Sequence, residues 1–242
     1  MARLRRGMVG IEAAIVLIAF VIVAAALAFV VLNMGFFTTQ KSQQVISSGL
    51  GEASTALEVD GSVLAYSNEG SKVNYMVIPI KVSPGRSAVD LHPNRTNIVY
   101  WSSSGSFADI YVGYGYVWYN STGKYYNLTI YNMTDDKVIQ TDIGGSVNLT
   151  AIWTKIISNE HLKKYNLSAY VIWIDSNQEY NKSDTNLELG EKALVMVVFN
   201  STNVMPKEYD VVKVEIKPPE GATLTIERTM PPGIPEGVID LG

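Results

Sequence analysis

Acceptor asparagines are the most frequent chemically defined motif in this chain. Eight Asn-x-Ser/Thr triplets occur, none with proline in the middle, and all lie beyond residue 90: Asn94, Asn120, Asn127, Asn132, Asn148, Asn166, Asn181 and Asn200. This triplet accepts a sugar on the asparagine amide and marks an exported surface. A polar surface also produces such triplets by chance, but eight exceed what this composition gives. We therefore expect N-glycosylation in this part of the chain.

Residues for other kinds of chemistry are sparse. The chain has no cysteine, which excludes a thiol nucleophile and a thiolate metal site, and its two histidines, His92 and His161, have no partners at metal-ligand spacing. The sequence contains no GxSxG, HExxH or phosphate-binding pattern. Asp135, Asp136 and Asp142 could bind calcium through oxygen, but a solvated loop is the simpler interpretation. The sequence predicts no enzyme, no cofactor and no metal site.

Alternation along the expected strands places four of the acceptors. Asn148 and Asn166 each lie on the opposite face from the apolar residues that follow them, so both are expected to be exposed. Asn127 and Asn132 are an odd number of residues apart, so a straight strand would point them to opposite faces. Unless that strand ends near Tyr131, we expect one of the two to be unmodified.

The N-terminus is expected to enter a membrane. Residues 13–32 are apolar and follow three arginines, Arg3, Arg5 and Arg6. This run is about as long as a bilayer-spanning helix needs, at ~1.5 Å per residue. Basic residues before it favour a cytoplasmic N-terminus and export of the rest of the chain. The run is longer than the roughly 7–15 residues of a secretory signal, and no cleavage pattern for that pathway follows it.

The helix is expected to continue beyond the membrane. Ile46, Leu50, Ala53 and Leu57 recur at helical spacing, so a single helix is predicted from about residue 11 to residue 57. Its second half is amphipathic and is expected to dock on a globular domain. The turn residues 60–62 would end it.

Beyond about Val59 the pattern has period two and is rich in β-branched and aromatic residues. Pro79 argues for a sheet edge, Gly113 and Gly115 for a bend or packing contact, and residues 218–221 for a hairpin turn. Prolines at 231, 232 and 235 would end regular structure. The expected strands are 73–82, 108–119, 125–131, 147–153, 169–174, 193–199, 209–217 and 222–228. The predicted fold class is α+β, a long N-terminal hydrophobic helix followed by an all-β sandwich-like ectodomain.

The N-terminal residues resemble a known signal. Arg5-Arg6-Gly7-Met8-Val9-Gly10-Ile11-Glu12, followed by the apolar run, is similar to the class III signal of archaeal flagellins (archaellins) and type IV pilins. The resemblance covers about residues 1–65 and is closest to crenarchaeal archaellins. It implies cleavage between Gly7 and Met8 by a prepilin-type signal peptidase, with Gly10 in the recognised sequence. It divides the chain into a cleaved leader, residues 1–7, a filament-core helix, residues 8–58, and a glycosylated outer domain, residues 59–242.

The resemblance also implies a role for Glu12, which becomes the fifth residue after cleavage. Many archaellins lack an acid at this position, whereas type IV pilins usually have one. We expect Glu12 to assist assembly by pairing with the new amine of Met8 in a neighbouring subunit. The alternative is a plain first-turn acid that interacts only with the positive end of its own helix.

These observations predict a structural subunit of the archaellum filament, an extracellular homopolymer used for swimming motility. The resemblance implies an assembly platform and an ATPase as partners, with the precursor held in the cytoplasmic membrane. Two alternatives stay open: an adhesive archaeal type IV pilin, which Glu12 supports, and a membrane-retained single-span surface protein whose leader stays uncut. The net charge is −4, with no basic patch outside the leader, so nucleic-acid binding has no support.

Overall fold

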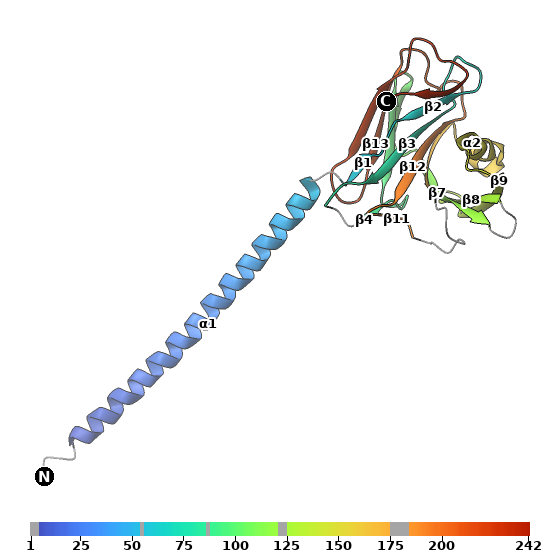
Figure 1. Ribbon diagram of the computed structural model, residues 1–242. Coiled ribbons are helices and arrows are strands. Elements are labelled where there is room, and N and C mark those ends of the chain that lie inside the picture. The colour runs from blue at the N-terminus through green and yellow to red at the C-terminus, as the bar shows by residue number, and fades with distance from the viewer. Residues whose placement is uncertain (1–4, 54–55, 86–87, 121–124, 175–183) are drawn as a thin grey trace. The chain divides into compact units, whose positions relative to one another are not determined.

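The computed structural model divides the chain into two units, Met1–Gly51 and Glu52–Gly242 (Figure 1). It describes residues 5–53, 56–85, 88–120, 125–174 and 184–242. The first unit is a single helix, α1 (Arg5–Ala53), and the second is a β-rich outer domain with two short helices, α2 (Leu149–Ser158) and α3 (Glu160–Lys163). The predicted α+β class is confirmed, and the two helices are an addition to the all-β domain that the sequence predicts.

Helix α1 extends over 49 residues without a proline. Two hydroxyl groups in its middle turn back onto the backbone: Thr38 donates to the carbonyl of Met34 (2.8 Å) and Thr39 to that of Gly35 (2.9 Å). Such bonds satisfy polar side chains without an external partner. The helix ends before the predicted Leu57, because that residue begins strand β1 and is fully buried in the outer domain.

The described residues of the outer domain form three sheets. The large sheet has the strand order β15-β2-β3-β12-β10-β7-β8-β9, with β1 also paired to β3; β11 pairs with β4, and a small sheet has the order β14-β13-β5-β6. The strands are β1 (Leu57–Val59), β2 (Leu64–Ser67), β3 (Tyr75–Val82), β4 (Ala88–Asp90), β5 (Asn97–Ser102), β6 (Gly105–Phe107), β7 (Tyr111–Asn120), β8 (Tyr125–Asn132), β9 (Lys137–Gly144), β10 (Leu167–Ile174), β11 (Asn186–Glu188), β12 (Lys192–Phe199), β13 (Val211–Lys217), β14 (Leu224–Thr229) and β15 (Gly237–Asp240).

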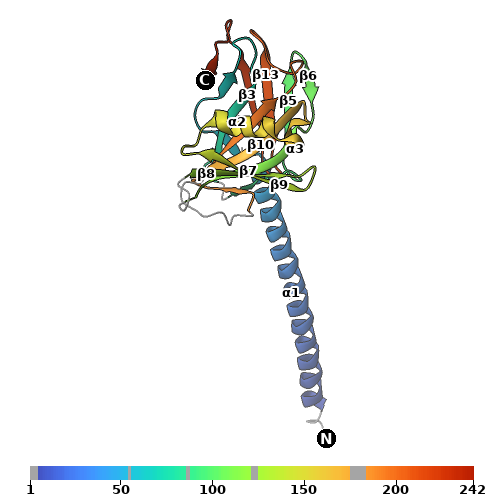
Figure 2. The ribbon, with the colours of Figure 1, turned by 90° about the vertical axis from the view of Figure 1, so that its right-hand side faces the viewer.

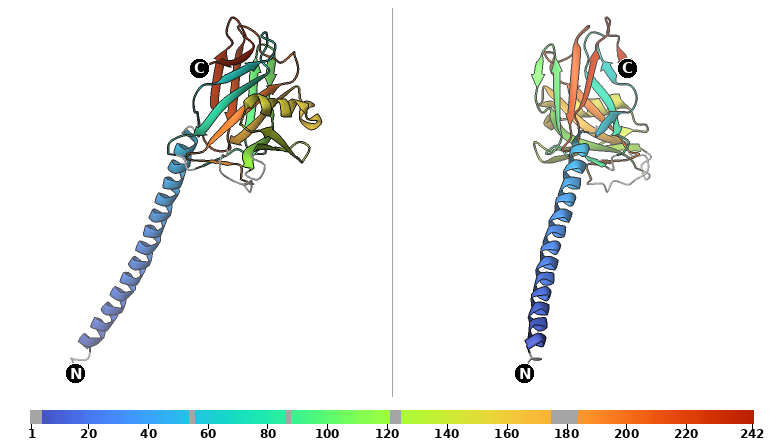
Figure 3. Two further views of the ribbon diagram at one scale, coloured as in Figure 1. Left: turned by 45° about the vertical axis from the view of Figure 1, so that its right-hand side comes forward. Right: turned by 90° about the vertical axis from the view of Figure 1, so that its left-hand side faces the viewer.

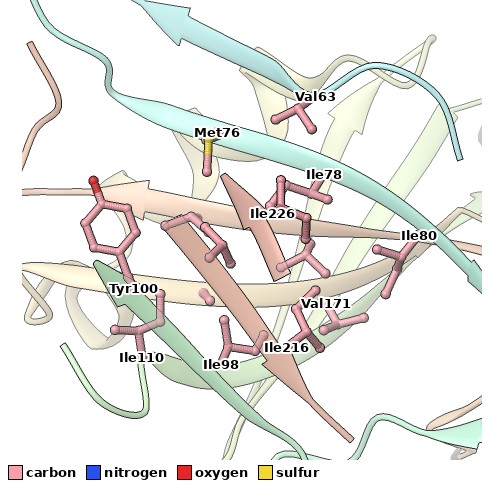
Figure 4. Close-up of a cluster of buried hydrophobic side chains, with 14 of the residues drawn as sticks. Val63, Met76, Ile78, Ile80, Ile98, Tyr100, Ile110, Val171, Ile216 and Ile226 are labelled. Carbon is pink, nitrogen blue, oxygen red and sulfur yellow. The ribbon is translucent and has the colours of Figure 1, made fainter. Parts of the chain in front are cut away.

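Apolar side chains fill both sides of the large sheet. One cluster lies between the large and small sheets and includes Ile78, Val171 and Ile216 (Figure 4). A second cluster, with Ile156, Tyr170 and others, lies between the large sheet and the pair α2–α3, which covers its other face (Figures 2 and 3). The small sheet and the two helices therefore cover opposite faces of the large sheet. This is the predicted sandwich, with a helical layer added.

The predicted strand over 147–153 is wrong, because this segment begins helix α2. The side chain of Asn148 accepts a hydrogen bond from the backbone N–H of Thr150 (2.9 Å) and so caps the helix. Ile152, Trp153 and Ile156 then lie on the face that packs against the sheet. A segment of seven residues is too short to distinguish the period of a strand from that of a helix, so alternation alone gives the wrong element here.

Two expectations from proline are also wrong. Strand β3 is internal: β12 pairs with one side, while β1 pairs with residues 80–82 and β2 with residues 75–77 on the other. Pro79 lies in the gap between β1 and β2, where its carbonyl accepts the N–H of Asp60 (2.9 Å). The missing N–H of Pro79 therefore removes no ladder bond. After the C-terminal prolines, the chain forms β15, which pairs with β2 at one edge of the large sheet.

The remaining expected strands are confirmed, and β13 and β14 form the predicted hairpin. Gly113 and Gly115 are packing positions. A Cβ on Gly113 would lie 2.1 Å from the carbonyl oxygen of Tyr131, and one on Gly115 would lie 2.8 Å from that of Thr129. The glycines let β8 approach β7 closely at these two points.

Candidate functional sites: the apolar helix and the acceptor asparagines

Helix α1 is uncovered within the single chain. Every side chain described between Gly10 and Leu50 is exposed, including Phe20, Phe29 and Phe37 at 67–72 %. The segment Gly10–Gly51 is long and apolar enough to cross a membrane, with a mean hydropathy of 3.4 over its most apolar window. Isolated proteins do not leave an apolar surface of this size in water. The helix therefore requires lipid or other protein chains around it.

The predicted processing residues lie at the start of this helix. Arg5, Arg6, Gly7 and Met8 belong to the first turns of α1, although their side chains lie outside the described part. Gly10 has no heavy atom within 4 Å of an added Cβ. Glu12 is exposed and shares one helix face with Val16 and Phe20, at steps of four residues. Ile46 and Leu50 are exposed as well, so docking of the second half of α1 stays a prediction.

A charged cluster follows the helix at the start of the outer domain. Asp60 lies between two lysines, Lys81 at 3.2 Å and Lys192, and Lys81 also reaches Glu58 at 3.2 Å. The hydrogen bonds from Lys192 and Lys81 lower the pKa of Asp60. These residues join β1, β3 and β12 across the surface of the large sheet.

Four acceptor asparagines are exposed or half-buried. Asn94, Asn148 and Asn166 are exposed, the last two as expected, although Asn148 is exposed as a helix cap rather than on a strand. Asn200 is half-buried, and its side-chain N–H donates to the carbonyl of Tyr165 (2.7 Å). Its backbone N–H donates to the carbonyl of Asn166 (2.9 Å), so two acceptors from distant segments lie side by side.

Two other acceptors are buried. Asn127 is 7 % exposed and Asn132 is 1 % exposed. The side-chain oxygen of Asn132 accepts the N–H of Thr134 (3.0 Å), and its amide points toward the carbonyl of His161 (3.5 Å) under α3. Both are buried because apolar clusters cover both faces of the large sheet, and the expectation that one of the two is unmodified stays a prediction. The side chain of Asn120, and all of Asn181, lie outside the described residues.

Two of the three aspartates that could have bound calcium have partners within the protein. Asp135 forms an ion pair with Lys164 (2.5 Å), whose hydrogen bond lowers the pKa of this carboxyl, and Asp142 accepts the N–H of Gly144 (2.6 Å). Within the described ranges, the structure places no three His, Asp or Glu side chains where they could share a metal ion.

These features define a class of structural surface protein. Its outer domain has a buried core of its own, whereas its apolar helix must be buried by other molecules. Comparison with known proteins agrees. The family model described as archaeal-type flagellin matches residues 7–228. Probable flagellin 1 of Aeropyrum pernix is 42 % identical over 241 residues, covering 99 % of this chain and 100 % of that protein. Flagellin FlaB2 of Saccharolobus shibatae is 41 % identical over 128 residues, 52 % of this chain and 39 % of that one.

Two solved structures are similar to this chain, and the first of them supports the fold. The crystal structure of archaeal flagellin FlaB1 from Methanocaldococcus jannaschii has a TM-score of 0.50 at 18 % identity, covering 76 % of this chain and 95 % of that one. The archaeal flagellum of Methanospirillum hungatei strain JF1 has a TM-score of 0.49 at 26 % identity, covering 95 % and 98 %. The chain belongs to the archaeal-type flagellins. It is a structural, non-enzymatic subunit of the extracellular archaellum filament, as the N-terminal resemblance implies.

Proposed function

We propose that this subunit polymerises with copies of itself through α1, and that the helix forms the core of the swimming filament. The observation that supports this proposal is the exposure of α1 on all sides within the chain. A helix that is apolar all round must be buried by something. Close packing of helices replaces lipid by protein, and small residues such as Ala24–Ala26 and Gly35 favour close approach.

The proposal includes removal of residues 1–7. The membrane precursor would be cut after Gly7 by a prepilin-type signal peptidase and then passed to an assembly platform with its ATPase. Glu12 would pair with the new amine of Met8 in a neighbouring subunit. Mass spectrometry on sheared filaments tests this: a chain that begins at Met8 supports it, and a chain that begins at or near Met1 contradicts it. A Gly7→Val variant should accumulate uncut in the membrane and leave the cell without filaments.

The outer domain is proposed to carry N-linked glycans on Asn94, Asn148, Asn166 and Asn200. The exposed or half-buried position of these four residues supports this assignment, because a glycan can leave the folded surface there. Asn127 and Asn132 are expected to be bare, since a sugar on a buried amide could not be accommodated beneath the neighbouring strands and helix. Peptide mass spectrometry on filaments gives the occupancy of each site. Sugar on Asn132 in folded filaments would contradict this assignment.

A further inference from the structure

The acceptor triplets of Asn94 and Asn166 present the amide to solvent but bury the hydroxyl that completes the triplet. We propose that at these two positions the sugar is attached before the outer domain folds, and that the folded subunit is no longer a substrate there. This inference rests on the proposed glycosylation and adds an order of events to it.

The two hydroxyls are buried in different surroundings. Thr96 is 1 % exposed, and its hydroxyl donates to the carbonyl of Asp90 (2.7 Å). Ser168 has no exposed surface and lies in β10, the strand between β7 and β12, on the face that α2 and α3 cover. Asn94 and Asn166 themselves remain exposed. In each triplet, an exposed asparagine is followed two positions later by an inaccessible hydroxyl.

The chemistry of transfer requires access to the whole triplet. A bond forms between the asparagine amide nitrogen and the anomeric carbon of the sugar, while the bond between that carbon and a phosphate oxygen of a lipid-linked donor breaks. The amide gives up one proton, and the lipid phosphate leaves. Because the motif demands Ser or Thr two residues on, the transferase must contact that hydroxyl. It cannot reach the hydroxyl of Ser168 or Thr96 in the folded domain.

The other accessible acceptors differ. Thr202, which completes the triplet of Asn200, is exposed. Thr150, which completes that of Asn148, is half-buried and lies 3.1 Å from the hydroxyl of Tyr75. Among the triplets that the structure describes, the hydroxyl residue Thr202 is therefore exposed in the folded state, and Thr150 is partly covered.

Chain order explains how an early transferase can act at Asn94 and Asn166 but not at the two buried amides. Both triplets are completed by segments that come later in the chain. Thr185 contacts Asp90 beside Thr96. Helices α2 and α3 precede Ser168, but the sheet face on which they pack includes Met196 and Val198 of β12, which pairs with β10. Asn127 and Asn132 lie instead in the local β7–β8–β9 meander. Local hairpins form in about 1–10 μs, whereas long-range pairing waits for distant strands. During export from the N-terminus, the meander and the following helix α3, toward which the Asn132 amide points, emerge before β12, while the other two triplets are still open.

The test compares folded and unfolded full-length chains as acceptors. The unglycosylated chain is produced in a host without a transferase and kept in detergent. Membranes from the natural producer cells, with the gene for this chain deleted, supply the transferase and its lipid-linked donor. A Glu188→Thr substitution provides the control, because it completes a triplet at Asn186 in β11 where both positions are exposed in the folded state. An unfolded reference carries Val195→Asp and Val214→Asp in the two sheets of the sandwich, both at fully buried sites.

On the folded chain, we expect occupancy at Asn94 and Asn166 to be at least about tenfold below that at Asn186, since exposing a core strand requires nearly global unfolding. On the unfolded reference, all three sites should be modified to similar extents, and Asn127 and Asn132 should be modified too. Occupancy at Asn94 and Asn166 within about twofold of Asn186 on the folded chain would overturn the order of events but not the glycosylation itself. If filaments isolated from cells carry no sugar at any of the sites, both the order of events and the proposed glycosylation are overturned.

Discussion

The close approach of β8 to β7 makes Gly113→Ala the most informative single change in the outer domain. Cβ atoms in proteins essentially never lie within 3.0 Å of non-bonded heavy atoms of distant residues. A Cβ on Gly113 would lie 2.1 Å from the carbonyl oxygen of Tyr131 and 3.1 Å from its carbonyl carbon. Both are backbone atoms, so no side-chain rotation relieves the overlap. The two strands would have to separate by about 1 Å, which weakens ladder hydrogen bonds and the packing around them.

We expect this substitution to lower the free energy of unfolding by about 3 kcal/mol, the upper part of the range for overpacked sites. For a domain of this size that corresponds to a decrease of roughly 6–12 °C in Tm. The matched control is Gly145→Ala, because an added Cβ there meets no atom within 4 Å. The Tm of the control should stay within about 3 °C of the parent or rise slightly. Thermal unfolding of the full chain in detergent, followed by near-UV circular dichroism, gives both values. Equal Tm values for the two variants would refute the argument.

Three further outcomes are expected. Ser168→Ala should remove the sugar from Asn166 and leave Tm within about 3 °C of the parent. The buried hydroxyl of Ser168 interacts with that of Tyr170 but forms no hydrogen bond of standard geometry among the described residues; a large decrease in Tm would contradict this. Lysine partners lower the pKa of Asp60 from 3.8 and that of Glu215 from 4.5. The stability that these ion pairs contribute is therefore complete above about pH 4.5 and is lost as pH falls through the lower folded-state pKa values. Tm should decrease below about pH 4, and it should decrease less in an Asp60→Asn variant. Glu12→Ala should leave export and cleavage intact but reduce the filament mass sheared from cells, and an undiminished yield would exclude a role for Glu12 in assembly.

The sequence predicts those features that depend on local pattern. The apolar run and its flanking charges define α1, and the period-two segments define most strands, because alternation directly reflects which face is buried. Helix α2 was missed since its first residues alternate like a strand. The internal position of Pro79 depends on β1 and β2 leaving a gap opposite it, which is a property of pairing between distant segments and has no local signal.

Some features of the acceptor sites are likewise predicted by local pattern, and others depend on packing between distant segments. The triplets themselves are read directly from the sequence, and the exposure of Asn166 follows from alternation. The burial of Ser168 does not follow, because alternation places it on a nominally polar face that α2 and α3 then cover. One signal was available: both faces of residues 167–173 carry large apolar side chains, including Tyr170 and Ile172, which is typical of a central strand covered on both sides.

The uncovered helix has a consequence for the lifetime of the assembled filament. In the filament proposed above, with α1 buried in the core, releasing a subunit into water would expose the apolar residues 13–32, at a cost of about 20 kcal/mol if each contributes about 1 kcal/mol. That cost lowers the dissociation constant by about 14 powers of ten. The critical concentration of such a polymer in water is effectively zero. A filament that holds these helices would not exchange subunits with the surrounding medium, so a damaged length would be lost by breakage rather than by depolymerisation.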